Sequence, residues 1–270
     1  MKLLNGSELA LFIKERQARE VTQLRRVNNI TPKLAIVMCV EDPVINTYVR
    51  LKKKYGADLR VEVDVHEVKQ IQIPDLIEKL NKDKSIHGII VQLPLENIEE
   101  TDEIVNLVAP GKDVDALGAR SKFEPATPMA ILWLLAGYNI DVNTKKVLLI
   151  GRGKLVGTPL EKILKNSGVE VTIADRHTVA LDKLTSTADI IITATGSPAI
   201  LYPSMVKSGV VIVDAGVASE NGKTDGDVAP EMYDREDITI TPSKGGVGPL
   251  TVCALFENVI RSAQMKTAKH

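Results

Sequence analysis

The sequence is poor in aromatic side chains and carries almost no net charge. Phe, Trp and Tyr make up 3% of the 270 residues, and the formal net charge is −1. Binding to nucleic acid is not expected, because the chain offers neither a basic field nor aromatic platforms on which bases could stack. The near-zero charge also gives no attraction to an anionic membrane surface. The composition therefore predicts neither nucleic acid nor a membrane as a partner.

Cysteine is also scarce. Cys39 and Cys253 lie far apart, each inside an apolar run. Two buried free thiols are the favoured interpretation, and a disulfide or a shared metal is the alternative. The chain has four histidines: His66, His87, His177 and His270. Since none of them forms a ligand pattern with cysteines or acids, no metal is expected.

Long hydrophobic runs are missing as well. No apolar stretch approaches the roughly 18 residues that a membrane-spanning helix needs. The polar Asn5-Gly6-Ser7-Glu8 interrupts the N-terminus before a signal-peptide core forms, so we expect a cytoplasmic protein. A hydrophobic content of 44% with 26% charged residues is typical of a globular protein, and the length suits two domains.

Short β-branched runs alternate with longer amphipathic stretches, which is typical of βαβ units around a parallel sheet. The predicted strands cover residues 34–40, 61–68, 86–93, 147–150, 169–174, 189–194, 210–214 and 238–241. The predicted helices cover residues 6–27, 46–56, 74–83, 98–108, 128–138, 157–167, 179–187 and 249–263. On the first helix, much of the apolar face is expected from Leu9, Leu11, Ile13, Val21 and Leu24.

A strand, a glycine turn and a helix start follow one another in residues 147–159. Gly151, Gly153 and Gly157 are spaced Gly-x-Gly-x-x-x-Gly, one residue longer than the standard dinucleotide fingerprint. Glycines let backbone amides approach a pyrophosphate, and a helix N-terminus favours its negative charge. A glycine turn alone is weak evidence, because many folds use one between a strand and a helix. The strand before it and the helix after it make a Rossmann-like cofactor site the better interpretation.

The choice between NAD and NADP depends on the end of the next strand, which meets the adenosine ribose. An acid there indicates NAD, whereas an arginine indicates the 2′-phosphate of NADP. The sequence offers both in Asp175 and Arg176, and Arg152 in the glycine turn adds a second guanidinium. Because two arginines can bracket a phosphate, NADP is the prediction. The alternative is that Asp175 caps a turn and Arg176 is a surface charge.

Four further motifs carry side chains suited to chemistry. Tyr48 and Lys52 are four residues apart, and therefore share one face of a predicted helix. Gln92 ends a buried strand in Val-Gln-Leu-Pro-Leu, and Asp115 closes Lys-Asp-Val-Asp. Pro249 follows the glycine-rich turn Gly-Gly-Val-Gly. Taken singly, each has an ordinary structural explanation as a helix face, a strand end or a loop.

Taken in this order, the motifs resemble the bifunctional methylenetetrahydrofolate dehydrogenase/cyclohydrolase family over nearly the whole chain. The likeness runs from Leu4-Asn5-Gly6 through the motifs above to Gly226-Asp227-Val228 and Gly-Gly-Val-Gly-Pro-x-Thr. It implies oxidation of 5,10-methylenetetrahydrofolate to 5,10-methenyltetrahydrofolate with NADP, followed by hydrolysis to 10-formyltetrahydrofolate. It also implies a homodimer that serves one-carbon metabolism and purine biosynthesis.

The resemblance assigns a role to each candidate side chain. Lys52 becomes the central catalytic residue, Gln92 orients it, and Tyr48 is both catalytic and packed over the folate. Asp115 holds the amino-pyrimidine end of the pterin, whose N–H groups suit a carboxylate acceptor, and Pro249 shapes the wall of the folate cleft. The residues expected to bind the cofactor are Gly151, Arg152, Gly153, Arg176, Thr195, Gly196 and Val217.

The physical chemistry of lysine agrees with this assignment. Partial desolvation in a cleft lowers the pKa of Lys52 toward the range useful for acid–base work. A neutral amine relays a proton from water, whereas an ammonium would repel the methenyl cation. No metal is needed, because that cation is already a strong electrophile.

The expected fold is α/β with two lobes and the active site between them. Residues 1–126, joined by the closing C-terminal helix 249–263, form an N-terminal α/β folate lobe. Residues 127–248 form a Rossmann-like dinucleotide-binding lobe. Compared with the family, the segment from Asp115 to Pro125 is shorter than expected, and Gly153 replaces a serine.

Two other functions are compatible with a dinucleotide-binding turn in a two-lobed protein. One is a two-lobed NADP dehydrogenase acting on shikimate-like hydroxy acids, which would not need Gly-Gly-Val-Gly-Pro. The other is a non-catalytic nucleotide-sensing domain, in which Lys52 would have no consequence.

Overall fold

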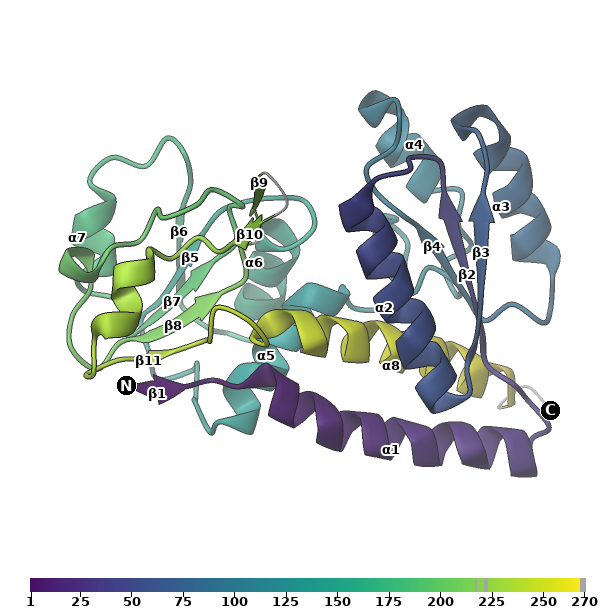
Figure 1. Cartoon of the computed structure of the whole chain (residues 1–270), viewed down its shortest axis with the longest axis horizontal. Helices are drawn as coiled ribbons and strands as arrows, with labels where there is room; N and C mark the ends of the chain where they lie inside the picture. Colours follow the sequence, from purple (N-terminus) through teal and green to yellow (C-terminus); the bar gives the residue numbers. More distant parts are fainter. Residues whose placement is uncertain (217, 221–222, 268–270) are drawn as a thin grey trace. The chain divides into compact units, whose positions relative to one another are not determined.

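The computed structural model describes residues 1–216, 218–220 and 223–267. The chain divides into two compact units. The six-stranded unit comprises Met1–Ala10 and Thr127–Thr251, and the three-stranded unit comprises Leu11–Ala126 and Val252–His270. Each unit has its own parallel sheet (Figure 1). The prediction of an α/β protein with two parts is confirmed.

The six-stranded unit contains an all-parallel sheet in the order β1-β11-β8-β7-β5-β6. Its strands are β1 (Lys2–Leu3), β5 (Val147–Ile150), β6 (Val171–Ala174), β7 (Ile190–Thr193), β8 (Val211–Asp214) and β11 (Thr239–Ile240). The helices are α5 (Ala126–Gly137), α6 (Gly157–Asn166) and α7 (Leu181–Thr185), with 3-10 turns η3 (Pro203–Met205) and η4 (Pro230–Asp234). Strand β9 (Ala218–Glu220) pairs antiparallel with β10 (Lys223–Asp225).

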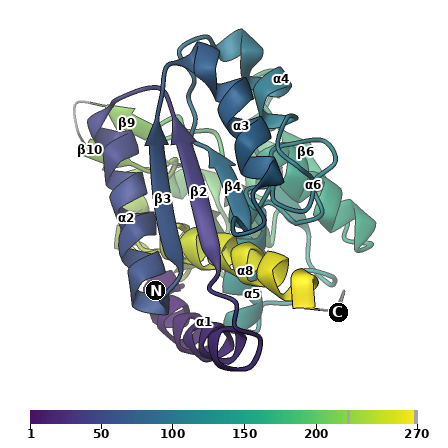
Figure 2. The same ribbon diagram turned by 90° about the vertical axis from the view of Figure 1, so that its right-hand side faces the viewer.

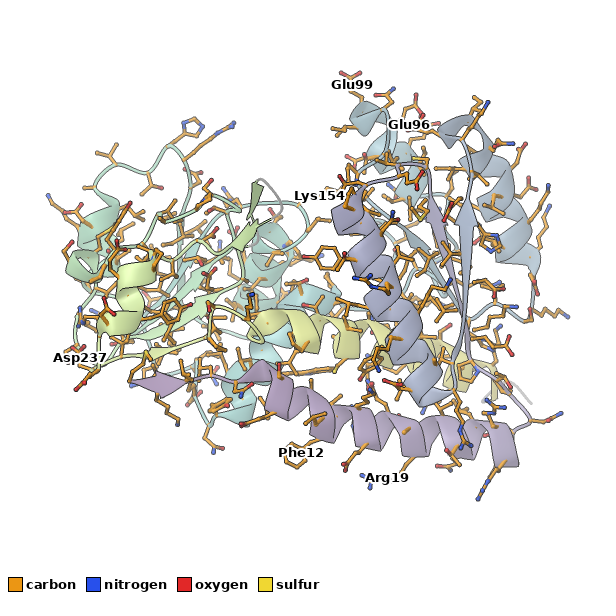
Figure 3. All side chains as sticks on the ribbon, viewed as in Figure 1. Phe12, Arg19, Glu96, Glu99, Lys154 and Asp237 are labelled. Atoms are coloured by element: carbon orange, nitrogen blue, oxygen red, sulfur yellow. The ribbon has the colours of Figure 1, made fainter. Side chains whose placement is uncertain are left out.

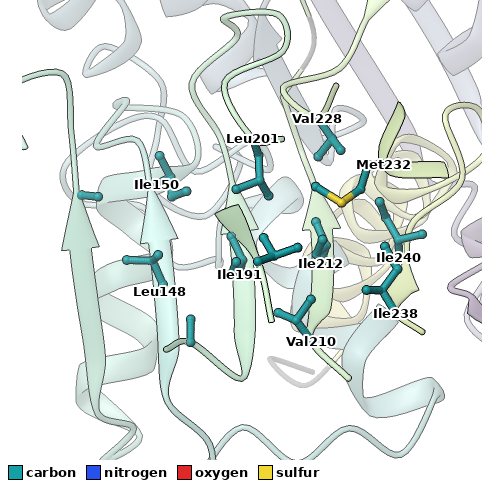
Figure 4. Close-up of a cluster of buried hydrophobic side chains, with 13 residues drawn as sticks. Leu148, Ile150, Ile191, Leu201, Val210, Ile212, Val228, Met232, Ile238 and Ile240 are labelled. Atoms are coloured by element: carbon teal, nitrogen blue, oxygen red, sulfur yellow. The ribbon is translucent and has the colours of Figure 1, made fainter. Parts of the chain in front are cut away.

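The core of this unit explains why its strands read as uninterrupted apolar runs. Strands β5 and β7 are buried along their whole length, as expected for a parallel sheet that is covered on both faces. Side chains such as Leu148, Ile191 and Ile212 pack with Leu201 and Met232 in one hydrophobic cluster (Figure 4).

The three-stranded unit contains a parallel sheet in the order β3-β2-β4, seen side by side in Figure 2. Its strands are β2 (Lys33–Met38), β3 (Glu62–Glu67) and β4 (Gly88–Val91). The helices are α2 (Pro43–Leu59), α3 (Ile73–Lys82) and α4 (Thr101–Val105), with 3-10 turns η1 (Gln70–Gln72) and η2 (Ile98–Glu100). Side chains of α3 and α4, such as Ile77 and Ile104, pack with Val37 and Val91 of the sheet.

Two long helices, α1 (Gly6–Val27) and α8 (Val247–Thr267), each contribute residues to both units. On α1 the buried positions include Gln17, Val21 and Leu24, which lie on one stripe of the helix. The expectation that Leu11 joins this apolar face is wrong, because Leu11 is 63% exposed. At 3.6 residues per turn it lies off the stripe, and its neighbour Phe12 also projects from the helix (Figure 3).

The predicted helices and strands are confirmed in kind, with one correction. The helix expected over residues 98–108 is instead the 3-10 turn η2 followed by the short α4. The reason is local: the side chain of Asn97 accepts from the Glu99 N–H and begins a tighter turn.

Of the two cysteine thiols, Cys253 is buried as expected, whereas Cys39 is only partly buried, so the expectation of two buried thiols is wrong for Cys39. None of the helices in the described part of the chain combines the length and the hydropathy that a membrane-spanning helix requires.

Candidate active site

Lys52 and Gln92 meet in the three-stranded unit. Lys52 is on α2, and Gln92 directly follows β4. The Lys52 Nζ donates to Gln92 Oε1 over 2.7 Å. The other end of the amide is also engaged, since Gln92 Nε2 donates to the carbonyl of Leu93 over 3.1 Å. The backbone N–H of Gln92 donates to Val37 O, which extends the sheet ladder one residue past β4. The acceptor for Lys52 is therefore held on a rigid strand end.

Asp115 and Lys52 influence each other electrostatically. Burial lowers the pKa of the Lys52 ammonium, and the nearby Asp115 carboxylate opposes this shift by favouring the charged amine. Burial likewise raises the pKa of Asp115, and Lys52 opposes that shift. Both side chains are partly buried. The structure thus brings Lys52, Gln92 and Asp115 together, although they come from three separate segments of the chain.

Asp113 fixes the turn that presents Asp115. It is 3% exposed, and its carboxylate accepts from the backbone N–H groups of Leu117 at 3.3 Å and Gly118 at 2.9 Å. Burial raises the pKa of Asp113 to about 6. The Ser121 hydroxyl donates to the Asp113 carbonyl over 2.8 Å. Sequence reasoning assigned Asp113 no role, because its partners are backbone groups of the following turn.

Tyr48 and Pro249 lie in different units. Tyr48 is on α2, one turn before Lys52, and its side chain is 40% exposed, so the ring is open to a ligand. Pro249 is the third residue of α8 and belongs to the six-stranded unit. The turn before it contains Gly245 with a φ of +82°, a conformation that favours glycine.

The glycine turn after β5 is built so that backbone can approach backbone. Gly151 has a φ of +108°, and a Cβ there would lie 2.5 Å from the carbonyl oxygen of Ala194. A Cβ on Gly157 would lie 2.0 Å from the oxygen of Gly151. Gly153 is different, because its nearest such neighbour is 4.0 Å away. Two of the three glycines are therefore required by the fold, and position 153 has room for a side chain.

The residues expected to bind a cofactor follow three adjacent strand ends. Strand β5 has β6 on one side and β7 on the other, so the chain changes direction across the sheet at this point. Gly151 follows β5, Arg176 comes two residues after β6, and Thr195 comes two residues after β7, followed by Gly196. Such a switch point at the carboxyl edge of a parallel sheet is where open α/β folds bind ligands. The expected contact at Val217 lies outside the described residues.

The side chains near the expected ribose site form hydrogen bonds with neighbouring residues of the protein. Asp175 Oδ1 accepts from the His177 N–H over 2.9 Å, so this carboxylate caps a turn. Arg176 is exposed, and its Nε lies 3.2 Å from His177 Nε2. Arg152 is also exposed, and its Nε donates to Glu161 over 3.1 Å.

Asp227 is a site residue that sequence reasoning did not single out. It is fully buried, and its carboxylate accepts from the backbone N–H groups of Thr195 at 2.7 Å and Ser197 at 3.1 Å. Its own N–H donates to Asp214 Oδ1 over 3.1 Å. Asp227 therefore shapes the loop after β7. The only sequence signal was its place in Gly226-Asp227-Val228.

Two features define the class. A dinucleotide-type turn lies in one unit, and a desolvated lysine beside a glutamine and a carboxylate lies in the other. Together they are the features of a nucleotide-dependent oxidoreductase with a second, acid–base function. Among the described residues, no three His, Cys, Asp or Glu side chains cluster so that they could hold a metal ion.

Two family models match the chain. Residues 4–115 match the catalytic domain of tetrahydrofolate dehydrogenase/cyclohydrolase, and residues 125–267 match its NAD(P)-binding domain. The chain belongs to the tetrahydrofolate dehydrogenase/cyclohydrolase family, which confirms the resemblance seen in its motifs.

Relatives match over the full length. The chain is 35% identical over 279 residues to the bifunctional protein FolD of Acetivibrio thermocellus, with 98% of each chain covered. It is similar to the crystal structure of FolD from Campylobacter jejuni, with a TM-score of 0.92, 35% identity, and 98% and 99% of the two chains covered. It is also similar to the Trypanosoma brucei dehydrogenase-cyclohydrolase in complex with NADP and an inhibitor. That match has a TM-score of 0.90, 27% identity, and 98% of each chain covered.

Proposed function

We propose that this chain oxidises 5,10-methylenetetrahydrofolate with NADP and hydrolyses the resulting methenyl form to 10-formyltetrahydrofolate. The observation that carries the proposal is the contact between Lys52 Nζ and Gln92 Oε1 beside the carboxylate of Asp115. Membership of a family that combines both activities supports it. So does the full-length likeness to bifunctional relatives.

Hydrolysis of the methenyl group needs a proton relay, and Lys52 is proposed to provide it. Water adds to the methenyl carbon and loses a proton, and the ring nitrogen that departs from this carbon gains one. A neutral Lys52 amine accepts the first proton and returns it to the nitrogen as the carbon–nitrogen bond breaks. The second proton of the added water leaves to solvent as the formyl C=O bond forms, so hydrolysis of the methenyl cation releases one proton overall. The lowered pKa of Lys52 increases its neutral fraction, and Gln92 holds the amine without adding a charge.

Binding of the folate is proposed to fall to the remaining side chains of the site. The Asp115 carboxylate accepts from the N–H groups of the amino-pyrimidine, and Tyr48 packs on the ring system. Pro249 is proposed to contribute to the surface that binds the folate.

The cofactor accepts the hydride when it is bound, and the turn after β5 suits its pyrophosphate. Any side chain at Gly151 or Gly157 would fill the space in which backbone approaches backbone. The buried carboxylate of Asp227 holds the Thr195-Gly196 loop at the neighbouring strand end.

NADP is the proposed cofactor, and Arg176 is proposed to bind its 2′-phosphate. Its exposed guanidinium follows β6, where the ribose of a bound dinucleotide is expected. Asp175 is less available to bind the ribose hydroxyls of NAD than the sequence alone indicated, because its Oδ1 already accepts from the His177 N–H. The NADP complex of the Trypanosoma brucei relative supports this choice.

Family membership supports two further proposals, a homodimer and a cytoplasmic enzyme that supplies one-carbon units for purine biosynthesis. Sedimentation of the purified chain tests the first, since a monomeric mass across the working concentration range would contradict it.

An ultraviolet scan tests the proposed function. The purified chain is mixed with methylenetetrahydrofolate and NADP, and formation and decay of the methenyl absorbance are followed. We expect methenyl formation that depends on NADP, and decay faster than in the absence of protein. A dehydrogenase for hydroxy acids would reduce NADP with such an acid and not with the folate. A nucleotide sensor would bind NADP and catalyse neither step.

A further inference from the structure

The part of α8 within the three-stranded unit carries a row of polar side chains on one face. Asn258, Ser262 and Lys266 are each four residues apart, and therefore lie on one face. Asn258 is 5% exposed and Ser262 is 3% exposed. All three bond to main-chain carbonyls of the same unit. The Ser262 hydroxyl lies 2.5 Å from His87 O and 2.8 Å from Gly111 O, and Lys266 Nζ bonds Lys84 O and Ile86 O.

Asn258 differs from the other two in what it bonds. Its Nδ2 donates to Val114 O and to Glu124 O, both over 2.9 Å. The Val114 carbonyl belongs to the peptide bond that leads into Asp115, and the Glu124 carbonyl lies just after the end of the same loop. One amide therefore holds both ends of residues 115–123 against α8.

We propose that Asn258 is a positioning residue for folate binding, acting through the backbone that carries Asp115. The proposal rests on the proposed function, in which Asp115 holds the pterin. A planar amide suits the task, because its two N–H groups point in fixed and divergent directions and can reach two carbonyls at once. A leucine of similar volume has no donor, and a serine has one.

Loss of these bonds is expected to loosen Asp115 while the rest of the site stays in place. Lys52 is held on α2, and Gln92 is held at the end of β4. The hydrogen bonds of Asn258 to Val114 O and Glu124 O involve neither of these elements. Within the loop, Asp113 still holds the turn through Leu117 and Gly118. What changes is the attachment of the whole loop to α8. In an oriented site a misplacement of about 1 Å can cost about a hundredfold in catalytic efficiency, and a displaced Asp115 carboxylate loses its oriented contacts with the folate.

The experiment compares Asn258→Leu with Ser262→Ala. Both changes remove a buried side-chain donor within hydrogen-bond distance of two main-chain carbonyls. Asn258 supplies two N–H groups and Ser262 one O–H, and only the carbonyls bonded by Asn258 flank the loop with Asp115. We expect Asn258→Leu to raise the KM for the folate about tenfold or more, and to leave the KM for NADP unchanged. The kcat at saturating folate should fall by less than the KM rises. Ser262→Ala should lower the unfolding temperature to a similar extent and keep both KM values.

A double variant shows whether Asn258 acts through Asp115. If it does, Asp115→Asn combined with Asn258→Leu binds the folate no more weakly than Asp115→Asn alone. Additive losses would overturn the proposal, as would a folate KM in Asn258→Leu equal to that of Ser262→Ala. If Asn258→Leu does not fold, Asn258→Ser keeps one donor and is measured in the same way. A parent chain without either activity would contradict the proposed function itself, whereas the comparison between variants of an active parent tests Asn258 alone.

Discussion

The Nζ of Lys52 is held by Oε1 of Gln92 at 2.7 Å, and a neutral amide rather than a carboxylate is thus its direct hydrogen-bond acceptor. An amide oxygen accepts from an amine whether or not the amine carries a charge. A carboxylate in direct contact would stabilise the ammonium and raise its pKa strongly. The site therefore holds the amine in position and still lets it lose its proton.

The first prediction concerns the charge of Asp115. Because Asp115 raises the pKa of Lys52, Asp115→Asn should lower it, and the rise of methenyl hydrolysis with pH should have its midpoint at a lower pH than in the parent. The measurement is kcat against pH at saturating substrate, after subtraction of the uncatalysed rate. Asp58→Asn is the control, because Asp58 pairs with Lys14 and Lys54 on the surface. A midpoint that stays or moves upward would show that Asp115 does not act on the titrating group.

The second prediction concerns cofactor choice. If Arg176 contacts the 2′-phosphate, Arg176→Ser should weaken NADP far more than NAD. A charge-assisted contact contributes roughly 1.5–3 kcal/mol, which corresponds to a loss of about one to two decades in affinity. Titration of both cofactors measures the ratio directly. Equal losses would mean that Arg176 does not read the phosphate, and NAD would then become the better proposal.

The third prediction concerns Asp227. Replacement by Asn removes one acceptor and places an N–H donor against a backbone N–H of the loop at Thr195 or Ser197. A buried donor left without an acceptor costs about 1–3 kcal/mol, so the KM for NADP should rise about tenfold. Folate affinity measured in the absence of cofactor should not change. Asp237→Asn, on the surface beside Arg235, serves as the control. A fall in folate affinity equal to that for NADP would indicate general damage.

The fourth prediction concerns stability against pH in the three-stranded unit. Burial lowers the pKa of His87 from 6.5 to about 4, so the stability contributed by its neutral form is lost as the pH falls through this window. Burial raises the pKa of Asp113 from 3.8 to about 6, so its contribution is lost as the pH rises through an overlapping window. The two effects oppose each other in the parent.

Single variants should separate these two effects. In Asp113→Asn the opposing contribution of Asp113 is removed, so the free energy of unfolding should rise more steeply between pH 4 and 6.5 than in the parent, by on the order of 2 kcal/mol. In His87→Gln, which keeps an acceptor for the Lys33 N–H, the slope should change in the opposite direction. Denaturant unfolding at a series of pH values measures both. Parallel curves for the parent and the two variants would refute the assignment.

The sequence predicted the elements well wherever local residues decide the structure. Val147–Ile150 and Gly6–Val27 were predicted to the residue, because an apolar run or a helical stripe ends at each boundary. Strand β1 was missed, since two residues become a strand only through pairing with β11. The Lys52–Gln92 contact joins residues 40 positions apart, and only the family resemblance linked them. Asp227 and Asn258 were missed because their partners are backbone groups far along the chain, which leave no pattern in the sequence.

The most direct test of the account is the cyclohydrolase rate of Lys52→Met, measured beside Lys53→Met, which changes the exposed neighbour on α2. General acid–base help of this kind contributes about two to four decades, so Lys52→Met should lose hydrolysis of methenyltetrahydrofolate by at least that much. It should still bind the folate through Tyr48 and Asp115, and it should keep part of its dehydrogenase rate, because hydride transfer depends chiefly on positioning. Lys53→Met should match the parent in all three measurements. A Lys52→Met variant that binds the folate and hydrolyses the methenyl form at the parent rate would contradict the account.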